Sequence, residues 1–423
     1  IDLANPVFGA GSALIVVFTG IVAGSYPALY LSSFKPVKVL KSTVQVGKSA
    51  MIPRHILVVS QFIISILLIS ATIIVYEQIQ HVKDRDLGYD SNNLIMIPAT
   101  QEINSSYDAL KNDLLSSGAI ESLTRTSSPI TDIWNYSPAP DWPGKPENTN
   151  MLVSALRVGK DFTQTLGIKV TEGHDFTGKP IDSSSVMINK AAAALMNMKD
   201  PVGTEVTYGP NARKYTIIGI TENVVMSSPF KPVDPMVIFP EDGRGSFITL
   251  RLKRNIRPQQ GIAVLQKVFQ NYDPSAPFDY QFVDKEFGKK FASEELISSL
   301  TNIFAGLAIF ICCLGLAGLA SFTIEFRMKE IGIRKVLGAS IQQVLLLISR
   351  DFIKLVGIAF IIAVPLTWYL LNNWLQKYEY RIEISLWMFA VVGVFLLLLT
   401  LIVVSANIMK AAIRNPIKSL RSE

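Results

Sequence analysis

The sequence predicts a multi-pass α-helical membrane protein with an α+β extracytoplasmic domain. Several apolar runs are long enough to cross a bilayer, because a membrane helix needs about 20 apolar residues. Residues 79–286, between the second and third runs, have instead the mixed composition of a soluble domain. The chain of 423 residues is 49% hydrophobic and 17% charged, with a mean hydropathy of +0.33. That balance is too apolar for an ordinary soluble protein and fits membrane helices joined to one soluble domain.

The expected membrane helices are long runs almost free of charge. The first contains several glycines, which suit close helix packing in a membrane better than a soluble helix. We expect the membrane helices at residues 1–31, 56–78, 300–324, 351–373 and 386–409.

Lysine and arginine are distributed unequally between the two sides that these helices define. The basic loop 32–55, the segment 325–350 and the tail 410–423 are rich in Lys and Arg, whereas residues 79–286 and the loop 374–385 are mixed in sign. Positive residues favour the cytoplasmic side of a membrane. One orientation satisfies that rule everywhere, and it places the large domain outside. The net charge of +6 therefore reflects cytoplasmic loops and gives no indication of nucleic-acid binding.

The outer domain is predicted to alternate strands and helices. Its alanine-rich stretch follows a short apolar run directly, which is typical of a strand entering a helix. Turn residues separate the elements and are densest between 127 and 146. The expected strands are 94–97, 151–158, 186–189, 215–220, 236–239, 247–252 and 278–283, and the expected helices are 107–115, 161–166, 190–198 and 258–272.

Residues 287–324 are predicted to form one helix that leaves the membrane as a stalk. Residues 287–299 are polar but helix-compatible, and they run into the third membrane helix without a break. Within that helix, Cys313, Ala317 and Ser321 are small residues at four-residue intervals. Such a stripe lets a second helix approach closely, and tolerated lipid-facing positions are the alternative.

Aromatic residues crowd both edges of the loop 374–385. Tryptophan and tyrosine favour the membrane–water interface, so these residues are expected to form an interfacial belt. Pro365, inside the preceding helix, is expected to kink it because proline lacks the N–H that the helix needs. The belt residues are Trp368, Tyr369, Trp374, Tyr378, Tyr380 and Trp387.

Catalytic, metal and cofactor motifs are not evident in the sequence. His174 lies beside Asp175, where a solvated turn is favoured over a metal or acid–base site. Trp134 and Trp142 lie in a proline-rich loop that could be a partner surface or simply packed. Adjacent Cys312 and Cys313 cannot staple distant segments. We therefore predict a non-catalytic chain with no cofactor and no metal site.

A short charged stretch follows the third membrane helix and organises the rest. Residues 325–340 read EFRMKEIGIRKVLGAS, with basic residues on one side and isoleucine, valine and leucine on another. The pattern predicts a short amphipathic helix on the inner membrane face, with a solvated basic loop as the alternative.

This stretch resembles the coupling segment of ABC transporter permeases typified by the macrolide exporter MacB and the division protein FtsX. In that family the segment sits on a separate ATPase subunit, and this chain carries no Walker motif of its own. The resemblance therefore implies an ATPase partner chain that hydrolyses ATP. The residues implied to contact it are Glu330, Ile331, Gly332, Ile333, Arg334, Lys335, Gly338 and Ala339.

The outer domain also resembles the extracytoplasmic core domain of the same permeases. Its matching stretches are INKAAAALMNMKDPVGTEV and YTIIGITENVVMSSPFKPVDPMVIFP. Residues 36–41 (PVKVLK) are similar to residues 416–421 (PIKSLR), which suggests the later part of a two-repeat permease. The resemblance implies a bacterial inner-membrane location, contact with membrane lipid, a dimer of permease halves, and a periplasmic adaptor or hydrolase as a further partner.

Several functions stay open at this point. The first is a permease subunit that transmits ATP-driven motion to the outer domain for efflux of an antimicrobial or other periplasmic substrate. The second is a signalling subunit that binds a peptide or controls a cell-wall hydrolase without transport. A membrane receptor with no ATPase is the third.

Overall fold

The computed structural model describes residues 6–32, 52–146 and 151–413. Its internal contacts divide the chain into two units, Ile1–Ser60 and Gln61–Glu423. The first unit contains the helix α1 (Pro6–Ser32) and the start of α3 (Ile52–Lys83). Much of the predicted basic loop, the tail after residue 413 and both copies of the repeated motif lie outside the described residues.

The outer domain is built on one mixed β-sheet. Within its described residues the sheet has 11 strands, in the order β11-β1-β10-β2-β4-β9-β6-β8-β5, with β3 pairing β4 and β7 pairing β8. The pairs β4·β9 and β6·β8 are parallel and the others antiparallel. The strands are β1 (Leu94–Pro98), β2 (Ile120–Thr126), β3 (Tyr136–Pro138), β4 (Leu152–Val158), β5 (Val170–Gly173), β6 (Ser185–Asn189), β7 (Glu205–Tyr208), β8 (Arg213–Thr221), β9 (Met236–Pro240), β10 (Phe247–Leu252) and β11 (Gln281–Phe282).

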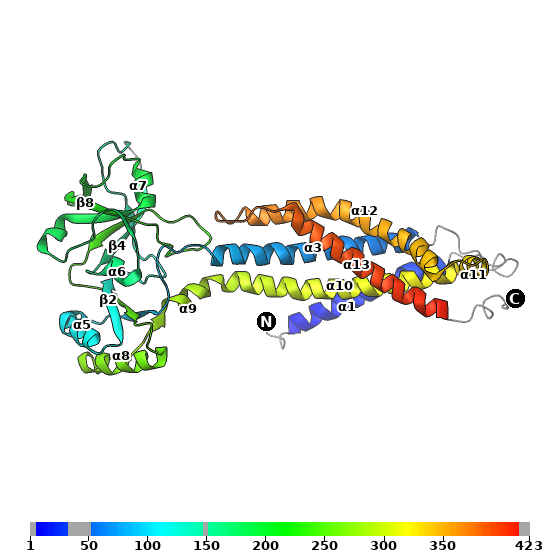
Figure 1. The fold of residues 1–423 in the computed structure, drawn as a ribbon, viewed down its shortest axis with the longest axis horizontal. Helices are drawn as coiled ribbons and strands as arrows, with labels where there is room; N and C mark the ends of the chain where they lie inside the picture. Colours follow the sequence, from blue (N-terminus) through cyan, green and yellow to red (C-terminus); the bar gives the residue numbers. More distant parts are fainter. Residues whose placement is uncertain (1–5, 33–51, 147–150, 414–423) are drawn as a thin grey trace. The chain divides into compact units, whose positions relative to one another are not determined.

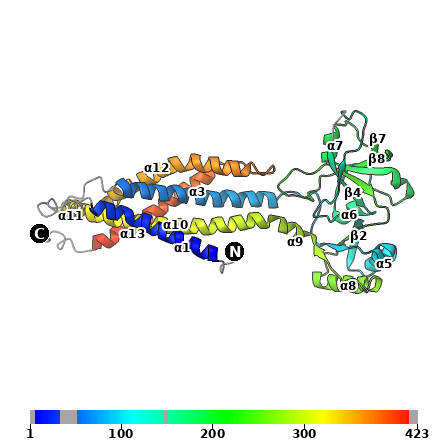
Figure 2. The ribbon, with the colours of Figure 1, turned by 180° about the vertical axis from the view of Figure 1, so that it is seen from behind.

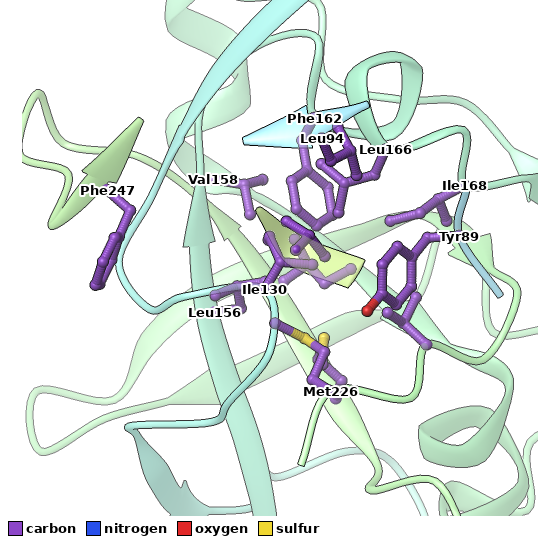
Figure 3. Close-up of a cluster of buried hydrophobic side chains, with 14 of the residues drawn as sticks. Tyr89, Leu94, Ile130, Leu156, Val158, Phe162, Leu166, Ile168, Met226 and Phe247 are labelled. Carbon is purple, nitrogen blue, oxygen red and sulfur yellow. The ribbon is translucent and has the colours of Figure 1, made fainter. Parts of the chain in front are cut away.

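Helices cover the sheet and close three apolar clusters. α5 and α8 pack against β1, β2 and β10 (Figure 1), and α7 covers the part of the sheet around β6 and β8. The third cluster brings side chains of β1, β4 and α6 together (Figure 3), among them Leu94, Val158 and Phe162. The domain's helices are α4 (Gln101–Ser105), α5 (Tyr107–Ser116), α6 (Phe162–Leu166), η2 (Pro180–Ser184), α7 (Lys190–Met196) and α8 (Pro258–Tyr272). The predicted α+β fold is confirmed.

One expected strand is shorter than predicted, and the strands β2, β3, β5 and β7 were not expected. The strand expected at 278–283 is reduced to β11, because only two of its residues pair with β1 and Val283 already begins α9 (Val283–Gly288). The strand β2 was not expected, since its IESLTRT sequence buries Thr124 and Arg125 and shows no apolar alternation.

The remaining helices form the predicted membrane part. α9, the short 3-10 turn η3 (Lys289–Phe291) and α10 (Ala292–Phe326) follow one another directly, so the single helix predicted from residue 287 contains a tighter turn at its start, and its role as a stalk stays a prediction. α10 is followed by α11 (Met328–Val336), α12 (Ile341–Leu375), which contains Pro365, and α13 (Leu386–Ile413). Figure 2, a view from behind, shows α3 and α10 beside each other.

Among the described residues, three helical stretches are long and apolar enough to cross a membrane: Ile52–Lys83, Val283–Phe326 and Leu386–Lys410. α1 and α12 are also helices, as expected, and their assignment as membrane helices stays a prediction.

Two glycines position these helices by leaving room for a partner side chain. A Cβ at Gly315 of α10 would lie 2.2 Å from Oε1 of Gln61 in α3, and one at Gly393 of α13 would lie 2.8 Å from the Phe360 ring of α12. Both are far inside normal contact distance. Glycine at these positions therefore permits the observed closeness of α3 to α10 and of α12 to α13.

Candidate functional site

The segment between α10 and α12 is a short helix with a defined start. α10 ends at Phe326, and Arg327 adopts a backbone conformation outside the helix (φ −97°, ψ 11°). α11 begins at the next residue and runs for nine residues to Val336. The predicted short helix at this place is therefore present, joined to a long helix at each end.

A glycine turn ends α11 and a capping box starts α12. Gly338 has a φ of +91°, a region that glycine adopts without the strain that a Cβ brings. The N–H of Ala339 donates to the carbonyl of Arg334 across the turn at 2.9 Å, as in a Schellman motif. Ser340 then caps α12, since its hydroxyl accepts from the N–H of Gln343 and the Gln343 side chain accepts from the N–H of Ser340.

The side chains of α11 leave apolar and charged groups in solvent. Ile333 is 57% exposed and Leu337, just after the helix, is 79% exposed. The Arg334 guanidinium lies 3.0 Å from the Glu330 carboxylate, an exposed pair one turn apart. Arg327 pairs with Asp351 of α12 at 2.9 Å and so links the two ends of the segment. An exposed apolar and charged surface of this kind is suited to a protein partner.

The predicted contact residues fall on this surface or support it. Glu330, Ile331, Gly332, Ile333 and Arg334 belong to α11, and Gly338 and Ala339 form the turn after it. The structure does not describe the side chain of Lys335. Apart from its chain neighbours and the backbone of its own helix, no atom of the described residues lies within 4 Å of a Cβ built at Gly332, so their packing does not require glycine there.

The predicted small-residue stripe is not the face on which α10 packs in this chain. Cys313 and Ala317 are half-buried and Ser321 is exposed. The buried side chains lie on the adjacent face: Cys312, Leu316, Leu319, Ala320 and Thr323. The stripe at Cys313, Ala317 and Ser321 therefore stays a prediction for contact with a further helix.

The predicted aromatic belt divides into two groups. Trp368, Tyr369 and Trp387 are exposed, as an interfacial belt requires. Tyr378 and Tyr380 instead pack, together with Trp374, on α3 and the β8–β9 loop (residues 222–235) of the outer domain. These three rings are half-buried against protein, and the interfacial position expected for the belt stays a prediction for both groups.

The other candidates behave as structural residues. The N–H of His174 donates to the carbonyl of Ile218, and Asp175 accepts a hydrogen bond from the Thr163 hydroxyl. Trp142 is buried, whereas Trp134 is 55% exposed and packs edge-on against Phe247. The residues that the structure describes include no group of three or more His, Cys, Asp or Glu side chains that could hold a metal ion.

Buried polar residues are the part of the structure that the sequence did not reveal. Arg251 of β10 donates to the backbone carbonyls of Asp90, Asn92 and Thr165 and fixes the chain where it enters the domain. Burial alone would raise the pKa of Asp90, but hydrogen bonds from Asn92 and the Arg251 charge outweigh it and lower that pKa below its usual value. Gln78 of α3 is fully buried as well. Their partners are distant in the sequence, so no local pattern could have identified them.

Comparison with known families agrees with this arrangement. Residues 56–268, half of the chain, match the family described as MacB-like periplasmic core domain, and residues 302–416 match the FtsX-like permease C-terminal family. The chain belongs to the MacB/FtsX-like family of ABC transporter permeases. The second match includes α11, the predicted coupling segment.

One curated relative is the macrolide export ATP-binding/permease protein MacB 2 of Aeromonas hydrophila subsp. hydrophila. It is 25% identical over 222 residues, which are 48% of this chain and 33% of the relative. The chain thus spans about a third of the length of the relative it matches.

Solved structures of outer domains are also similar. The periplasmic region of MacB from Actinobacillus actinomycetemcomitans is 14% identical, with a TM-score of 0.34 over 49% of this chain and 96% of that structure. A domain of a putative permease from Porphyromonas gingivalis is 15% identical, with a TM-score of 0.31 over 45% and 90%. The extracellular domain of the noncanonic ABC-type transporter YknZ from Gram-positive bacteria is 13% identical, with a TM-score of 0.31 over 45% and 98%.

Proposed function

We infer that this permease transmits ATP-driven motion from a separate ABC ATPase to its outer domain. α11 is the contact point in this proposal, because it exposes Ile333 and Leu337 and is joined to α10 and α12. The ATPase hydrolyses ATP on its own chain, and the permease itself is non-catalytic. Its location is the bacterial inner membrane, with the α+β domain on the outer side.

The substrate side of the proposal is export of an antimicrobial or another periplasmic substrate. The name of the Aeromonas relative, a macrolide export protein, supports efflux over a purely signalling role. The permease halves act as a dimer, and a periplasmic adaptor can join them on the outer side.

The observation that carries the proposal is the exposed apolar surface of α11 between two long helices. An isoleucine with 57% of its surface in water gains free energy when a partner covers it, at about 25 cal/mol per Å² of apolar area buried. If a charged side chain replaces this isoleucine, the contact loses that free energy and must also bear the cost of removing the charge from water.

The test is co-purification of the ABC ATPase with tagged permease from native membranes. We expect Ile333→Glu to reduce the recovered ATPase at least tenfold. The matched control is Ile181→Glu, since Ile181 is 74% exposed in the outer domain and the same substitution there should leave recovery unchanged. Equal recovery with both variants would contradict the proposal.

A further inference from the structure

Gln78 makes an unusual pair of contacts for a residue inside an apolar helix. Its side chain is fully buried, on a stretch of α3 whose Val75, Ile79 and Val82 belong to an apolar cluster. Its Nε2 donates to the carbonyl of Tyr380 at 3.0 Å, and its Oε1 accepts from the N–H of Ile382 at 2.9 Å. The amide thus uses a donor and an acceptor to bind the backbone of the α12–α13 loop, as a neighbouring strand would.

The same loop is also hydrogen-bonded to the outer domain, through the backbone N–H of Tyr380. The N–H of Tyr380 donates to the carbonyl of Phe230 in the β8–β9 loop at 3.0 Å. Phe230 is buried, with its ring centroid 5.2 Å from that of Tyr378 and 5.5 Å from that of Phe291 in η3. The backbone of one residue, Tyr380, therefore connects α3 to the outer domain.

Two cations fasten the β8–β9 loop at this point. Nη1 of Arg85 donates to the carbonyls of Pro229 and Lys231 at 2.7 and 2.6 Å, and its guanidinium lies 4.4 Å from the centre of the Tyr380 ring. Nζ of Lys290 donates to the carbonyl of Ser227. Burial lowers the pKa of Arg85, and the two carbonyls replace the water that its charge has lost.

The loop that reaches this point is the direct continuation of α12. That helix runs from Ile341, next to α11, to Leu375, and Gln376 starts the loop that bonds to Gln78. α11 is joined to η3 in the same way through α10. Two separate helices thus lead from α11 to the neighbourhood of Phe230, one through the stalk and one through α12.

We propose that Gln78, Tyr380 and Phe230 form a second transmission joint, through which α12 moves the outer domain in addition to the stalk. The proposal rests on the proposed function, because it requires that a partner displaces α11. It assigns Gln78 as a positioning residue: its amide holds the α12–α13 loop in register with α3, and Tyr380 passes the displacement to the β8–β9 loop.

The first experiment tests the joint itself in the full permease in lipid nanodiscs. We expect Gln78→Leu, which keeps volume and removes both bonds, to speed amide hydrogen exchange at least tenfold in residues 378–382 and 227–231. Gln80→Leu is the matched control on the same helix and should leave both segments unchanged. Faster exchange in 378–382 alone, or in neither segment, would overturn the joint. If Gln78→Leu does not fold, Gln78→Asn, whose shorter side chain draws the amide back from the backbone of Tyr380 and Ile382, should speed exchange in the same two segments.

The second experiment tests transmission in the complex with the co-purified ABC ATPase, with and without AMP-PNP. In the unaltered protein we expect the nucleotide to change hydrogen exchange in both the stalk 287–299 and the loop 222–235. In Gln78→Leu the stalk response should persist and the loop response should fall to less than half. An undiminished loop response, or loss of both responses together, would overturn the second route. Absence of any nucleotide response in the unaltered protein would instead contradict the proposed function.

Discussion

α11 and the proposed joint of Gln78, Tyr380 and Phe230 lie at opposite ends of α12, and they differ in how far their side chains are buried and bonded. At the joint, Gln78 is fully buried, and both the NH₂ group and the oxygen of its side-chain amide form hydrogen bonds. On α11, Ile333 and Leu337 are mostly exposed, and within the described part of the chain Arg334 forms its ion pair with Glu330 of the same helix. The difference teaches that the contacts of Gln78 are made within the chain, whereas α11 keeps an exposed surface that the proposed ATPase contact would cover.

The largest expected effect of a single substitution is at the joint. Phe230→Ala should lower the free energy of unfolding of the outer domain by about 3 kcal/mol, as for other buried Phe to Ala changes. Ile333→Ala on α11 should change stability by about 0.5 kcal/mol or less, because most of its side chain already contacts solvent. Thermal denaturation of both variants in detergent, followed by tryptophan fluorescence, measures the contrast. Similar losses of unfolding free energy in the two variants would contradict this difference between the two regions.

Backbone conformation on α11 gives the next effect. Gly338→Ala should destabilise the end of α11 by about 1–2 kcal/mol, since a Cβ is unfavourable at a φ of +91°. Gly332→Ala is the matched control inside the same helix, where alanine should stabilise the helix by about 0.5–1 kcal/mol. Hydrogen exchange of the amides of residues 331–337 should therefore move in opposite directions in the two variants. A shift in the same direction would show that the turn does not limit the stability of α11.

The exposed ion pair on α11 separates folding from binding. Arg334→Ala should change the stability of the permease by about 0.5 kcal/mol or less, because the pair with Glu330 is about half exposed and screened by solvent. The same variant should recover clearly less ABC ATPase from native membranes, if that surface serves a partner. Normal ATPase recovery would remove Arg334 from the contact surface.

The smallest effect is a pH dependence where the chain enters the outer domain. The pKa of Asp90 is lowered in the folded state, so its carboxylate stabilises the fold above the pKa of the unfolded chain, about 3.9, and this contribution is lost as the pH falls further. Asp90→Asn should flatten the fall of the melting temperature between about pH 5 and pH 3. An unchanged pH profile would show that the Arg251 contact does not depend on that charge.

Much of the architecture was predictable because it depends on local pattern. Apolar runs such as 386–409 and the strand 186–189 need only their own sequence to be recognised. The strand β2 was missed because Thr124 and Arg125 are buried through partners elsewhere in the sheet. The joint was missed for the same reason, since Gln78 and Tyr380 are 302 residues apart. For α11, the sequence predicted the helix. The exposure of Ile333 could not be predicted, because it depends on how α10 and α12 are placed around α11.

The most direct test of the account is photocrosslinking from α11 in living cells. A benzoylphenylalanine at position 333 should form an adduct with the ABC ATPase, whereas one at position 202, exposed in the outer domain, should not. An adduct at 333 that contains the ATPase would support α11 as the point where motion enters the permease. Failure to capture the ATPase at 333, or its capture at 202, would contradict the account.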